Sequence, residues 1–222
     1  MPVYNESGTI GAVIDRLLTI DLPLDREIIV VNDGSTDGTR EVLDKVAPGC
    51  ACVSIVHLPA NRGKGHAVRV GLSKSRGTIT AIQDADLELD PAQLKDLVQP
   101  VLDAKADAVY GSRFLKPSFT VPLVTRIGNK TLTWMTNTLF GQSLTDMETC
   151  YKIIRGDLAR SLDLTADRFD IEPEITVALL RRGHRIVELP VTFSPRSRAS
   201  GKKMRWRDGI EAVRMLWKHR RR

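Results

Sequence analysis

The chain has 222 residues, of which 42% are hydrophobic and 27% charged, so we expect a soluble globular protein of one domain and exclude disordered and fibrous classes. No apolar run comes near the roughly 18 residues of a membrane-spanning helix, and the opening MPVYNESGTI lacks the pattern of a secretory signal. The net charge of +6 arises from residues 196–222, which hold 11 Lys and Arg against 2 Asp and Glu, and such a basic tail predicts an anionic partner.

The chain opens on PVYNE, which has the character of a strand end without the body of the strand. In a doubly wound sheet the first strand is usually central, and losing it exposes the edges of its neighbours. We therefore expect a first strand that is missing or truncated, from a truncated or misassigned start of the sequence.

After this start, short runs rich in Val and Ile alternate with helical patterns, which predicts an α/β fold with a mostly parallel sheet flanked by helices. The predicted strands are residues 27–32, 52–58, 78–83, 107–111 and 185–193. The predicted helices are residues 7–20, 37–46, 65–75, 91–104 and 123–140. We expect one domain over residues 1–205, with a nucleotide-binding half at 1–111 and an acceptor half at 112–205, followed by a helix at 206–222.

Polar or charged turns follow all four early strands, whether those strands are seen or inferred. The turns are YNE at 4–6, NDGS at 32–35, NRGKG at 61–65 and DADLE at 84–88. Because ligands of open α/β sheets bind at the carboxyl ends of strands, we expect these turns to converge on one crevice.

Asp84, Asp86 and Glu88 place alternating carboxylates at the end of a predicted strand. Such carboxylates can converge on Mg²⁺ or Mn²⁺, which favour oxygen ligands shared with phosphate groups. The competing interpretation is a solvated acidic turn that caps the next helix, but Asp90, directly before Pro91, already has the capping position. We therefore predict a divalent metal site.

Asp33, in NDGSTDGT, either forms a simple turn or accepts hydrogen bonds from a base or ribose, and Tyr4 and Glu6 can do the same. Lys64 stands between two glycines at a predicted helix start, where a cation and backbone N–H groups suit a diphosphate. The segment lacks the GxxxxGK[ST] motif and the third glycine of a dinucleotide fingerprint, which argues against an NTPase and an NAD enzyme.

Together these segments resemble the family 2 glycosyltransferases, which are inverting nucleotide-sugar enzymes of GT-A (Rossmann-like) fold. PVYNE, NDGSTDGT, NRGKGHAVRVGL, DADLELDP and YGSRF stand in the family's order and spacing. The later segments LTDMETCYKIIRGDL, RFDIEPEITVALLRRG and PRSRASGKKMRWRDG are most similar to bacterial relatives of dolichol-phosphate mannosyltransferase. The resemblance implies a GDP-mannose or UDP-glucose type of donor, a polyprenyl (dolichyl or undecaprenyl) phosphate acceptor and Mg²⁺ or Mn²⁺.

The resemblance also implies roles for individual residues. The nucleoside would be held by Pro2, Tyr4, Glu6 and Asp33. Asp84 would bridge ribose and metal, and Asp86 and Glu88 would ligate the metal. The diphosphate and the acceptor phosphate would be met by Lys64, Ser112, Arg113, Arg126 and a basic loop with Arg196, Arg198, Lys202 and Lys203.

The acceptor decides whether a base is needed. A phosphate acceptor is already an anion, whereas a hydroxyl acceptor needs a group that takes its proton. Asp146, in LTDMET, is the nearest candidate for such a base. We interpret it instead as a residue that positions basic side chains or closes the site, and keep a saccharide hydroxyl acceptor as the alternative.

The basic tail predicts an amphipathic helix. Its apolar residues at helical spacing are Ile210, Val213, Leu216 and Trp217, and its basic face carries Arg207, Arg214, Lys218 and Arg221. Such a helix can lie on an anionic membrane or pack on the domain as a surface helix. We favour the membrane and expect a cytoplasmic protein, peripheral at the inner face of the cell membrane.

A nucleotide- or RNA-binding module is a distant alternative. The tail offers only Trp206 and Trp217 as stacking platforms, and the clustered carboxylates of the domain repel nucleic acid. We therefore expect no nucleic-acid partner.

Overall fold

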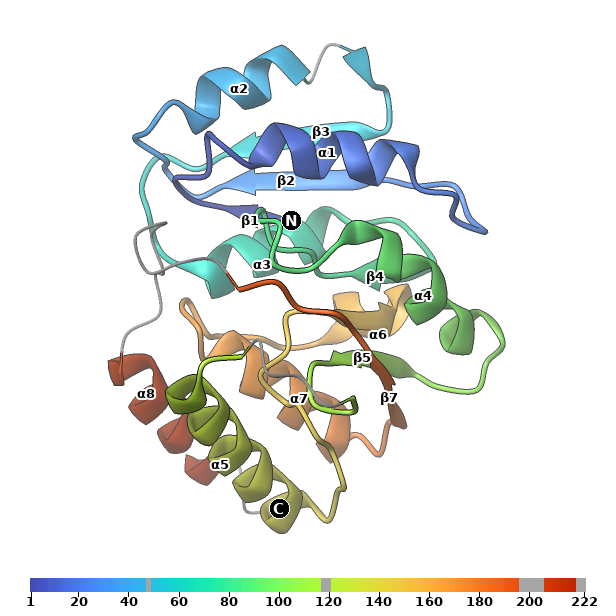
Figure 1. Ribbon diagram of the computed structural model, residues 1–222, viewed down its shortest axis with the longest axis vertical. Helices are drawn as coiled ribbons and strands as arrows, with labels where there is room; N and C mark the ends of the chain where they lie inside the picture. The colour runs from blue at the N-terminus through green and yellow to red at the C-terminus, as the bar shows by residue number, and fades with distance from the viewer. Residues whose placement is uncertain (47–48, 117–120, 196–205, 219–222) are drawn as a thin grey trace.

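The computed structural model describes residues 1–46, 49–116, 121–195 and 206–218 (Figure 1). The strands are β1 (Pro2–Val3), β2 (Ile28–Asn32), β3 (Val53–His57), β4 (Ile79–Ala81), β5 (Ala108–Ser112), β6 (Lys152–Arg155) and β7 (Ile186–Pro190). The helices are α1 (Ile10–Thr19), α2 (Thr39–Val46), α3 (Lys64–Lys74), the short η2 (Pro91–Gln93), α4 (Leu94–Leu102), α5 (Leu123–Phe140), α6 (Gly156–Ser161), α7 (Ile171–Arg181) and α8 (Trp206–Lys218). The alternation confirms the predicted α/β fold.

The described strands form two hydrogen-bonded sheets, in the orders β1-β2-β3 and β4-β6-β5-β7. The first is parallel throughout, and in the second β5 and β7 are parallel while β6 runs antiparallel to β4 and β5. Strand β6 was not predicted, because its segment KIIR is short and begins with Lys152, a fully buried lysine that interrupts the apolar pattern.

All five residues of β2 are buried because helices cover both of its faces. Ile28 and Val30 belong to the main core with residues of α1 and α2, such as Ile14 and Leu43. Val31, on the opposite face, packs with Ala67 of α3. This two-sided burial explains the continuous IIVV run, which is typical of a strand in a doubly covered parallel sheet.

Strand β1 consists of two residues that pair in parallel with Val31 and Asn32 of β2, as expected for a strand end. Both β1 and β4 are edge strands among those described. Residues next to both strands line a cavity of about 480 Å³, which is bordered by apolar residues such as Leu17 and Leu72 and by charged residues such as Arg26 and Glu27.

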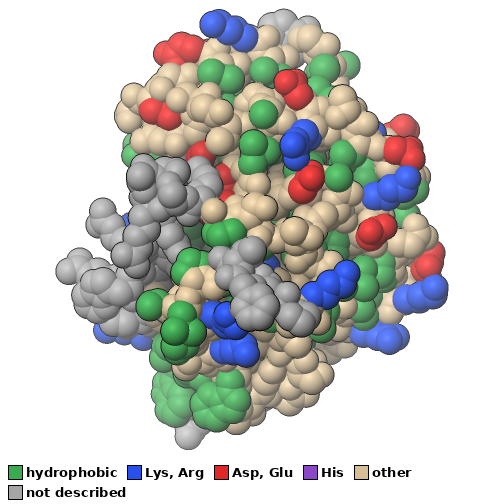
Figure 2. Space-filling model, in the orientation of Figure 1, with side chains coloured by type: hydrophobic (Ala, Val, Ile, Leu, Met, Phe, Trp, Pro, Cys, Tyr) green, Lys and Arg blue, Asp and Glu red, His purple; other side chains and the backbone are tan. Residues whose placement is uncertain are grey.

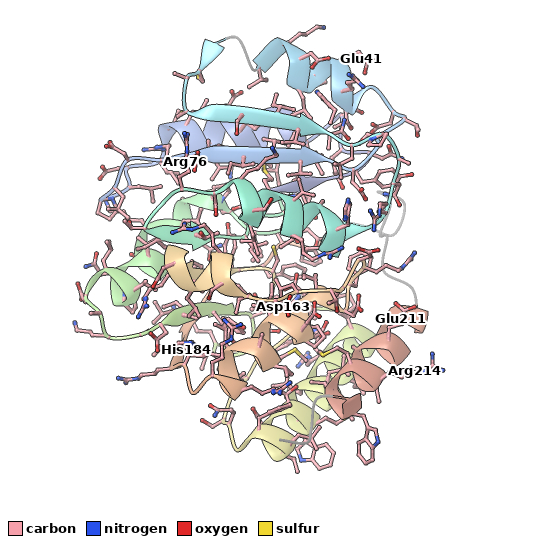
Figure 3. The ribbon with its side chains drawn as sticks, turned by 180° about the vertical axis from the view of Figure 1, so that it is seen from behind. Glu41, Arg76, Asp163, His184, Glu211 and Arg214 are labelled. Atoms are coloured by element: carbon pink, nitrogen blue, oxygen red, sulfur yellow. The ribbon has the colours of Figure 1, made fainter. Side chains whose placement is uncertain are left out.

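The C-terminal helix α8 packs on α5 and α7. Met215 and Leu216 are buried in a small core with Met147 and Val177. On the other side of the helix, Arg214 points away from the domain (Figure 3). One face of α8 thus packs as the surface-helix alternative expected, and no described helix is long and apolar enough to cross a membrane.

The start of α6 provides a test of backbone packing. A Cβ on Gly156 would lie 2.0 Å from the Gly77 carbonyl oxygen, so Gly156→Ala should destabilise the fold by about 2 kcal/mol or more. Gly128, in α5, has no atom within 4 Å of its added Cβ, so Gly128→Ala should gain about 0.5–1 kcal/mol from helix propensity. Urea denaturation of both variants checks the difference, and equal stabilities would contradict it.

Candidate active site

The carboxyl ends of β1, β2 and β4 and the start of α3 surround one cavity of about 190 Å³. It is lined by Pro2, Val3, Tyr4, Glu6, Asp33, Asn61, Gly63, Lys64, Ala67, Asp84, Ala85, Asp86, Arg168 and Phe169. All four polar turns contribute to this lining, so they meet as the sequence predicted.

Hydrogen bonds join the turn after β1 to the turns after β2 and β4. The Glu6 N–H donates to Thr39 Oγ1 at 2.8 Å, and Glu6 Oε2 accepts from Thr9 Oγ1 at 2.8 Å. The same Thr9 hydroxyl lies 2.9 Å from the Ala85 carbonyl oxygen. Thr39 and Thr9 therefore hold Glu6 at the cavity wall, and Thr9 also contacts the turn after β4.

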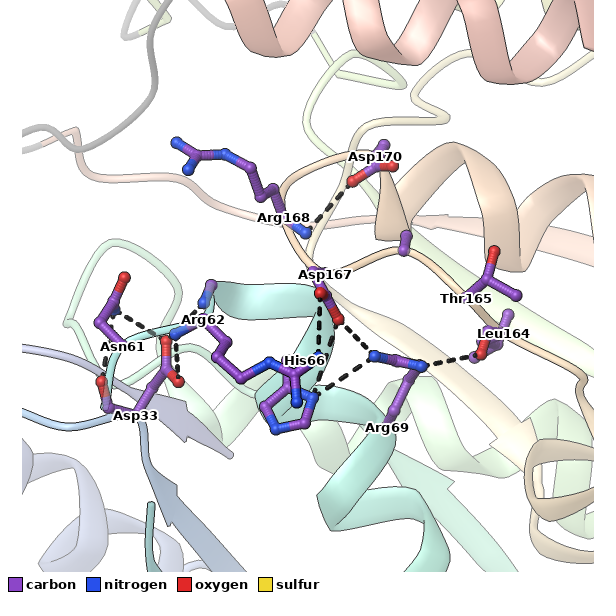
Figure 4. Close-up of polar contacts among 12 residues, drawn as sticks. Asp33, Asn61, Arg62, His66, Arg69, Leu164, Thr165, Asp167, Arg168 and Asp170 are labelled. Atoms are coloured by element: carbon purple, nitrogen blue, oxygen red, sulfur yellow. Dashed lines mark hydrogen bonds and ion pairs between the residues drawn. The ribbon is translucent and has the colours of Figure 1, made fainter. Parts of the chain in front are cut away.

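Asp33, which follows β2, fixes the turn that follows β3. One carboxylate oxygen accepts from the Arg62 N–H at 3.0 Å, and the other accepts from the Gly63 N–H at 2.7 Å and from Asn61 Nδ2 at 2.8 Å (Figure 4). Burial raises the pKa of Asp33, and the N–H groups of Arg62 and Gly63 oppose that shift. Asp33 thus lines the cavity and also shapes the neighbouring wall.

The glycines on either side of Lys64 allow a close backbone contact with the loop before α7. The Gly65 N–H donates to the Arg168 carbonyl oxygen at 3.1 Å. A Cβ on Gly63 would lie 2.4 Å from the Asp167 carbonyl oxygen, and one on Gly65 would lie 2.5 Å from that of Ala166. Neither position has room for a side chain.

Ion pairs hold the same loop against α3. Asp167 contacts Arg62 at 3.2 Å, a nitrogen of Arg69, and His66 at 3.8 Å (Figure 4). These partners come from the turn after β3 and from α3. Asp167 therefore links the loop before α7 to the N-terminal half of the chain.

Among the polar and aromatic residues of the cavity, three were not predicted as site residues: Asn61, Arg168 and Phe169. Asn61 lies in a turn that the sequence singled out, so only its side chain was overlooked. Arg168 and Phe169 begin the segment RFDIEPEITVALLRRG, which the family resemblance included but to which no role in the cavity was given.

A line of buried charges begins at the cavity. Lys64 Nζ lies 2.8 Å from Asp84 Oδ1 and 2.8 Å from Glu172 Oε1, and Glu172 Oε2 lies 2.9 Å from Lys152 Nζ. Burial alone lowers the pKa of Lys64, but the carboxylates of Asp84 and Glu172 outweigh it and raise that pKa. Burial likewise raises the pKa of Asp84, and the Lys64 ammonium reverses this effect and lowers it. Lys64 and Asp84 are therefore stabilised in their charged forms.

The three carboxylates predicted to hold a metal do not all converge. Asp84 and Asp86 line the cavity, but Glu88 does not. The Glu88 backbone is directed to the segment after β7, where its carbonyl oxygen accepts from the Ser194 N–H at 2.9 Å. Within the described part of the chain, no group of three His, Cys, Asp or Glu side chains could hold a metal ion.

Asp84 and Asp86 nevertheless fit a hard divalent ion that shares its ligands with a substrate. Both side chains present carboxylate oxygens to one open cavity. Mg²⁺ is commonly held by one or two carboxylates, with the remaining ligands supplied by water and phosphate oxygens.

A second polar cluster lies at the end of β5. Arg113 forms a bidentate ion pair with Asp146, with Nε–Oδ2 and Nη2–Oδ1 distances of 2.7 Å. Asp146 is fully buried, and its N–H donates to Glu188 Oε1 at 2.9 Å. Ser112 Oγ lies 2.6 Å from Thr145 Oγ1. Both carboxylate oxygens of Asp146 are thus used to orient Arg113.

The remaining predicted site residues are separate from the cavity. Ser112, Arg113, Arg126 and Asp146 do not line it. Arg126 lies in the first turn of α5, where its buried Nε has no hydrogen-bond partner among the described residues. The predicted basic residues Arg196, Arg198, Lys202 and Lys203 lie outside the described residues.

Glu148 is a half-buried residue beside both clusters that the sequence did not single out. Burial raises its pKa to about 7, Lys152 and Arg113 oppose the shift, and Glu172 adds to it. Its Oε1 atom is buried and has no hydrogen-bond partner in the described residues. Glu148 therefore titrates close to neutral pH.

The chain belongs to glycosyl transferase family 2, which it matches over residues 1–161. It is similar to undecaprenyl-phosphate mannosyltransferase of Micrococcus luteus, with 30% identity over 213 residues that cover 91% of this chain and 85% of the relative. Polyprenol monophosphomannose synthase of Mycolicibacterium smegmatis is 29% identical over 219 residues, which cover 92% and 81% of the two chains.

The fold is also similar to a solved glucosyl-3-phosphoglycerate synthase of Mycobacterium tuberculosis, in complex with Mn²⁺, UDP-glucose and phosphoglyceric acid. The two structures superpose with a TM-score of 0.74 at 23% sequence identity, and the match covers 99% of this chain and 77% of the other. At this identity, the similarity concerns the fold alone.

The raised pKa of Glu148 predicts a pH-dependent stability. Between its ordinary value of 4.5 and about 7, the folded state holds a proton that the unfolded state has lost, so stability falls as pH rises. The free energy of unfolding of the wild type should therefore fall relative to Glu148→Gln by up to about 3 kcal/mol between pH 5 and pH 8. Urea denaturation at both pH values measures this, with the exposed-site variant Glu41→Gln as control, and parallel pH profiles would refute it.

Proposed function

We propose that this enzyme catalyses the inverting transfer of a hexose from a nucleotide-diphosphate sugar to a polyprenyl phosphate. The observation that carries the proposal is the convergence of Asp84, Asp86 and Lys64 on one cavity at the strand ends. The names of the two relatives, both of which concern polyprenyl phosphates and mannose, support the acceptor class and a donor of GDP-mannose type. A donor of UDP-glucose type is the second possibility within the same proposal.

The donor would bind along the cavity wall. Pro2, Tyr4, Glu6 and Asp33 would hold the nucleoside, since carboxylates accept hydrogen bonds from base N–H and ribose O–H groups. Lys64, at the start of α3, would hold the diphosphate through its charge. The N–H groups of Gly63 and Gly65 do not take the predicted part in this, because they already donate to Asp33 and to the Arg168 carbonyl oxygen.

A divalent ion would be held by Asp84 and Asp86, with Glu88 as a further oxygen ligand only if its turn rearranges. Bound Mg²⁺ or Mn²⁺ would offset the negative charge that develops on the leaving diphosphate. The synthase of similar fold that is solved with Mn²⁺ and UDP-glucose supports this kind of ion.

The acceptor phosphate would meet the second polar cluster. Ser112, Arg113 and Arg126, together with the basic segment that contains Arg196, Arg198, Lys202 and Lys203, would attract its charge. A phosphate attacks as an anion, so no side chain has to remove a proton. Asp146 supports this assignment, because it is fully buried and both of its oxygens accept hydrogen bonds from Arg113. A saccharide hydroxyl acceptor with Asp146 as base is correspondingly disfavoured.

A polyprenyl acceptor resides in a membrane, and one face of α5 suits its surface. Leu123, Val124, Ile127 and Trp134 are 66%, 78%, 58% and 66% exposed. Figure 2 shows hydrophobic side chains gathered at this end of the molecule. Together with the basic tail, this face supports peripheral binding at the cytoplasmic side of an anionic membrane.

The transfer reaction can be tested with a panel of donors. Purified protein is incubated with undecaprenyl phosphate, Mg²⁺ or Mn²⁺, and radiolabelled GDP-mannose or UDP-glucose, and we expect label in the organic phase with one donor. Asp86→Ala should lower this transfer by about 100-fold or more, because it removes a metal ligand that supports the leaving group. Asp96→Asn, at an exposed position of α4, is the matched control and should retain activity.

Label that reaches only a water-soluble product, for example with phosphoglyceric acid as acceptor, would overturn the lipid acceptor. Near-normal transfer by a folded Asp86→Ala protein would overturn the metal assignment.

Binding to membranes can be tested on α5. Replacing Leu123, Val124 and Ile127 together by Gln should weaken partition into anionic vesicles by about tenfold or more, because each apolar side chain buried in lipid contributes roughly 1.5–3 kcal/mol at most. Vesicle sedimentation measures the partition, and Leu102→Gln serves as a control at an exposed apolar residue outside α5. Unchanged sedimentation of the triple variant would exclude this face from the membrane contact.

A further inference from the structure

Lys64 lies between two carboxylates that come from different parts of the chain. Its Nζ atom is 2.8 Å from Asp84 Oδ1, after β4, and 2.8 Å from Glu172 Oε1, in the first turn of α7. The Lys64 side chain is only 14% exposed, so these two anions are its main electrostatic partners. Either carboxylate could keep the ammonium if the other were withdrawn.

Glu172 is held independently of Lys64. Its second oxygen lies 2.9 Å from Lys152 Nζ, and Lys152 is fully buried. The Lys152 ammonium is itself fixed by the carbonyl oxygens of Met147 at 2.9 Å and Thr149 at 2.5 Å. Glu172 therefore remains in place whether or not Lys64 contacts Asp84.

The Asp84 carboxylate cannot pair fully with the Lys64 ammonium and with a divalent ion at the same time. Like charges beside one carboxylate repel each other, and the repulsion is strong where burial lowers the local dielectric constant. A metal ion bound at Asp84 would therefore weaken the Lys64–Asp84 contact. The Lys64–Glu172 contact does not use an oxygen of Asp84, so it can persist when an ion takes that carboxylate.

We propose that Lys64 is the resident counter-ion of Asp84 in the free protein, that a divalent ion displaces it, and that Glu172 is the positioning residue that keeps the displaced ammonium at the cavity wall. The displaced Lys64 then faces the space proposed for the diphosphate. This inference rests on the proposed function for the role of Asp84, and goes beyond it by giving Glu172 a role in metal binding.

The exchange can be measured with Mn²⁺ alone, by following the free-ion signal in electron paramagnetic resonance titrations without nucleotide. Lys64→Met removes the competing cation, so its Mn²⁺ affinity should rise by about threefold to tenfold. Glu172→Gln leaves Lys64 with Asp84 as its single anionic partner, so its Mn²⁺ affinity should fall by about fivefold. In the double variant the loss caused by Glu172→Gln should shrink to less than about twofold, because it acts through Lys64.

Two further variants distinguish positioning from general electrostatics. Asp163→Asn removes one carboxylate charge at an exposed position ahead of α7 that does not line the cavity, so Mn²⁺ affinity should stay within about twofold of the wild type. Lys64→Arg keeps the cation and should not show the gain of Lys64→Met. Glu172→Asp, which keeps the charge on a shorter side chain, should give an intermediate loss and serves if Glu172→Gln does not fold.

The proposal is overturned if Glu172→Gln and Asp163→Asn weaken Mn²⁺ binding alike, if the loss persists in full without Lys64, or if no variant binds Mn²⁺ at millimolar concentration. Sugar transfer is assayed separately on the wild type. If the wild type transfers sugar but the variants do not show the expected Mn²⁺ affinities, only the role of Glu172 is excluded. If the variants show those affinities but the wild type transfers no sugar, only the proposed reaction is excluded.

Discussion

The backbone contact between the loop 166–168 and the glycine turn 63–65 determines the form of the cavity. The carbonyl oxygens of this loop come so close to Gly63 and Gly65 that no side chain could be inserted at either position. The contact seats the start of α7 beside the start of α3, which brings Glu172 within reach of Lys64. Without it, the cavity would lose the wall formed by Arg168 and Phe169, and Lys64 would face Asp84 alone.

The sequence predicted the parts of the site that depend on local patterns. The Val- and Ile-rich runs predicted β2 and β3. The polar residues after each early strand predicted which turns would meet, because parallel strands end on the same side of a sheet. The Asp167 loop could not be predicted in this way, since its position depends on ion pairs with Arg62 and Arg69 across a long separation. Strand β6 was hidden because Lys152 is buried by its ionic partners and not by its own hydrophobicity.

Two clusters of paired charges lie beside the proposed binding sites for the donor and the acceptor. One joins Lys64, Glu172 and Lys152, and the other joins Arg113, Asp146 and Glu188. Buried ion pairs contribute little to stability, because the cost of removing charges from water offsets their attraction. They do fix the direction of each charged group before a substrate arrives, which is the condition for effective electrostatic stabilisation of a reaction. Charged groups that are fixed around an anionic substrate therefore lower the stability of the folded state somewhat, and in return they are already oriented when the substrate binds.

The cavity at the strand ends draws on both of the described sheets. Glu6 and Asp33 line it after strands of the first sheet, and Asp84 and Asp86 line it after a strand of the second. A molecule that fills it contacts residues next to both sheets. Its binding free energy therefore also stabilises the association of the two halves of the domain.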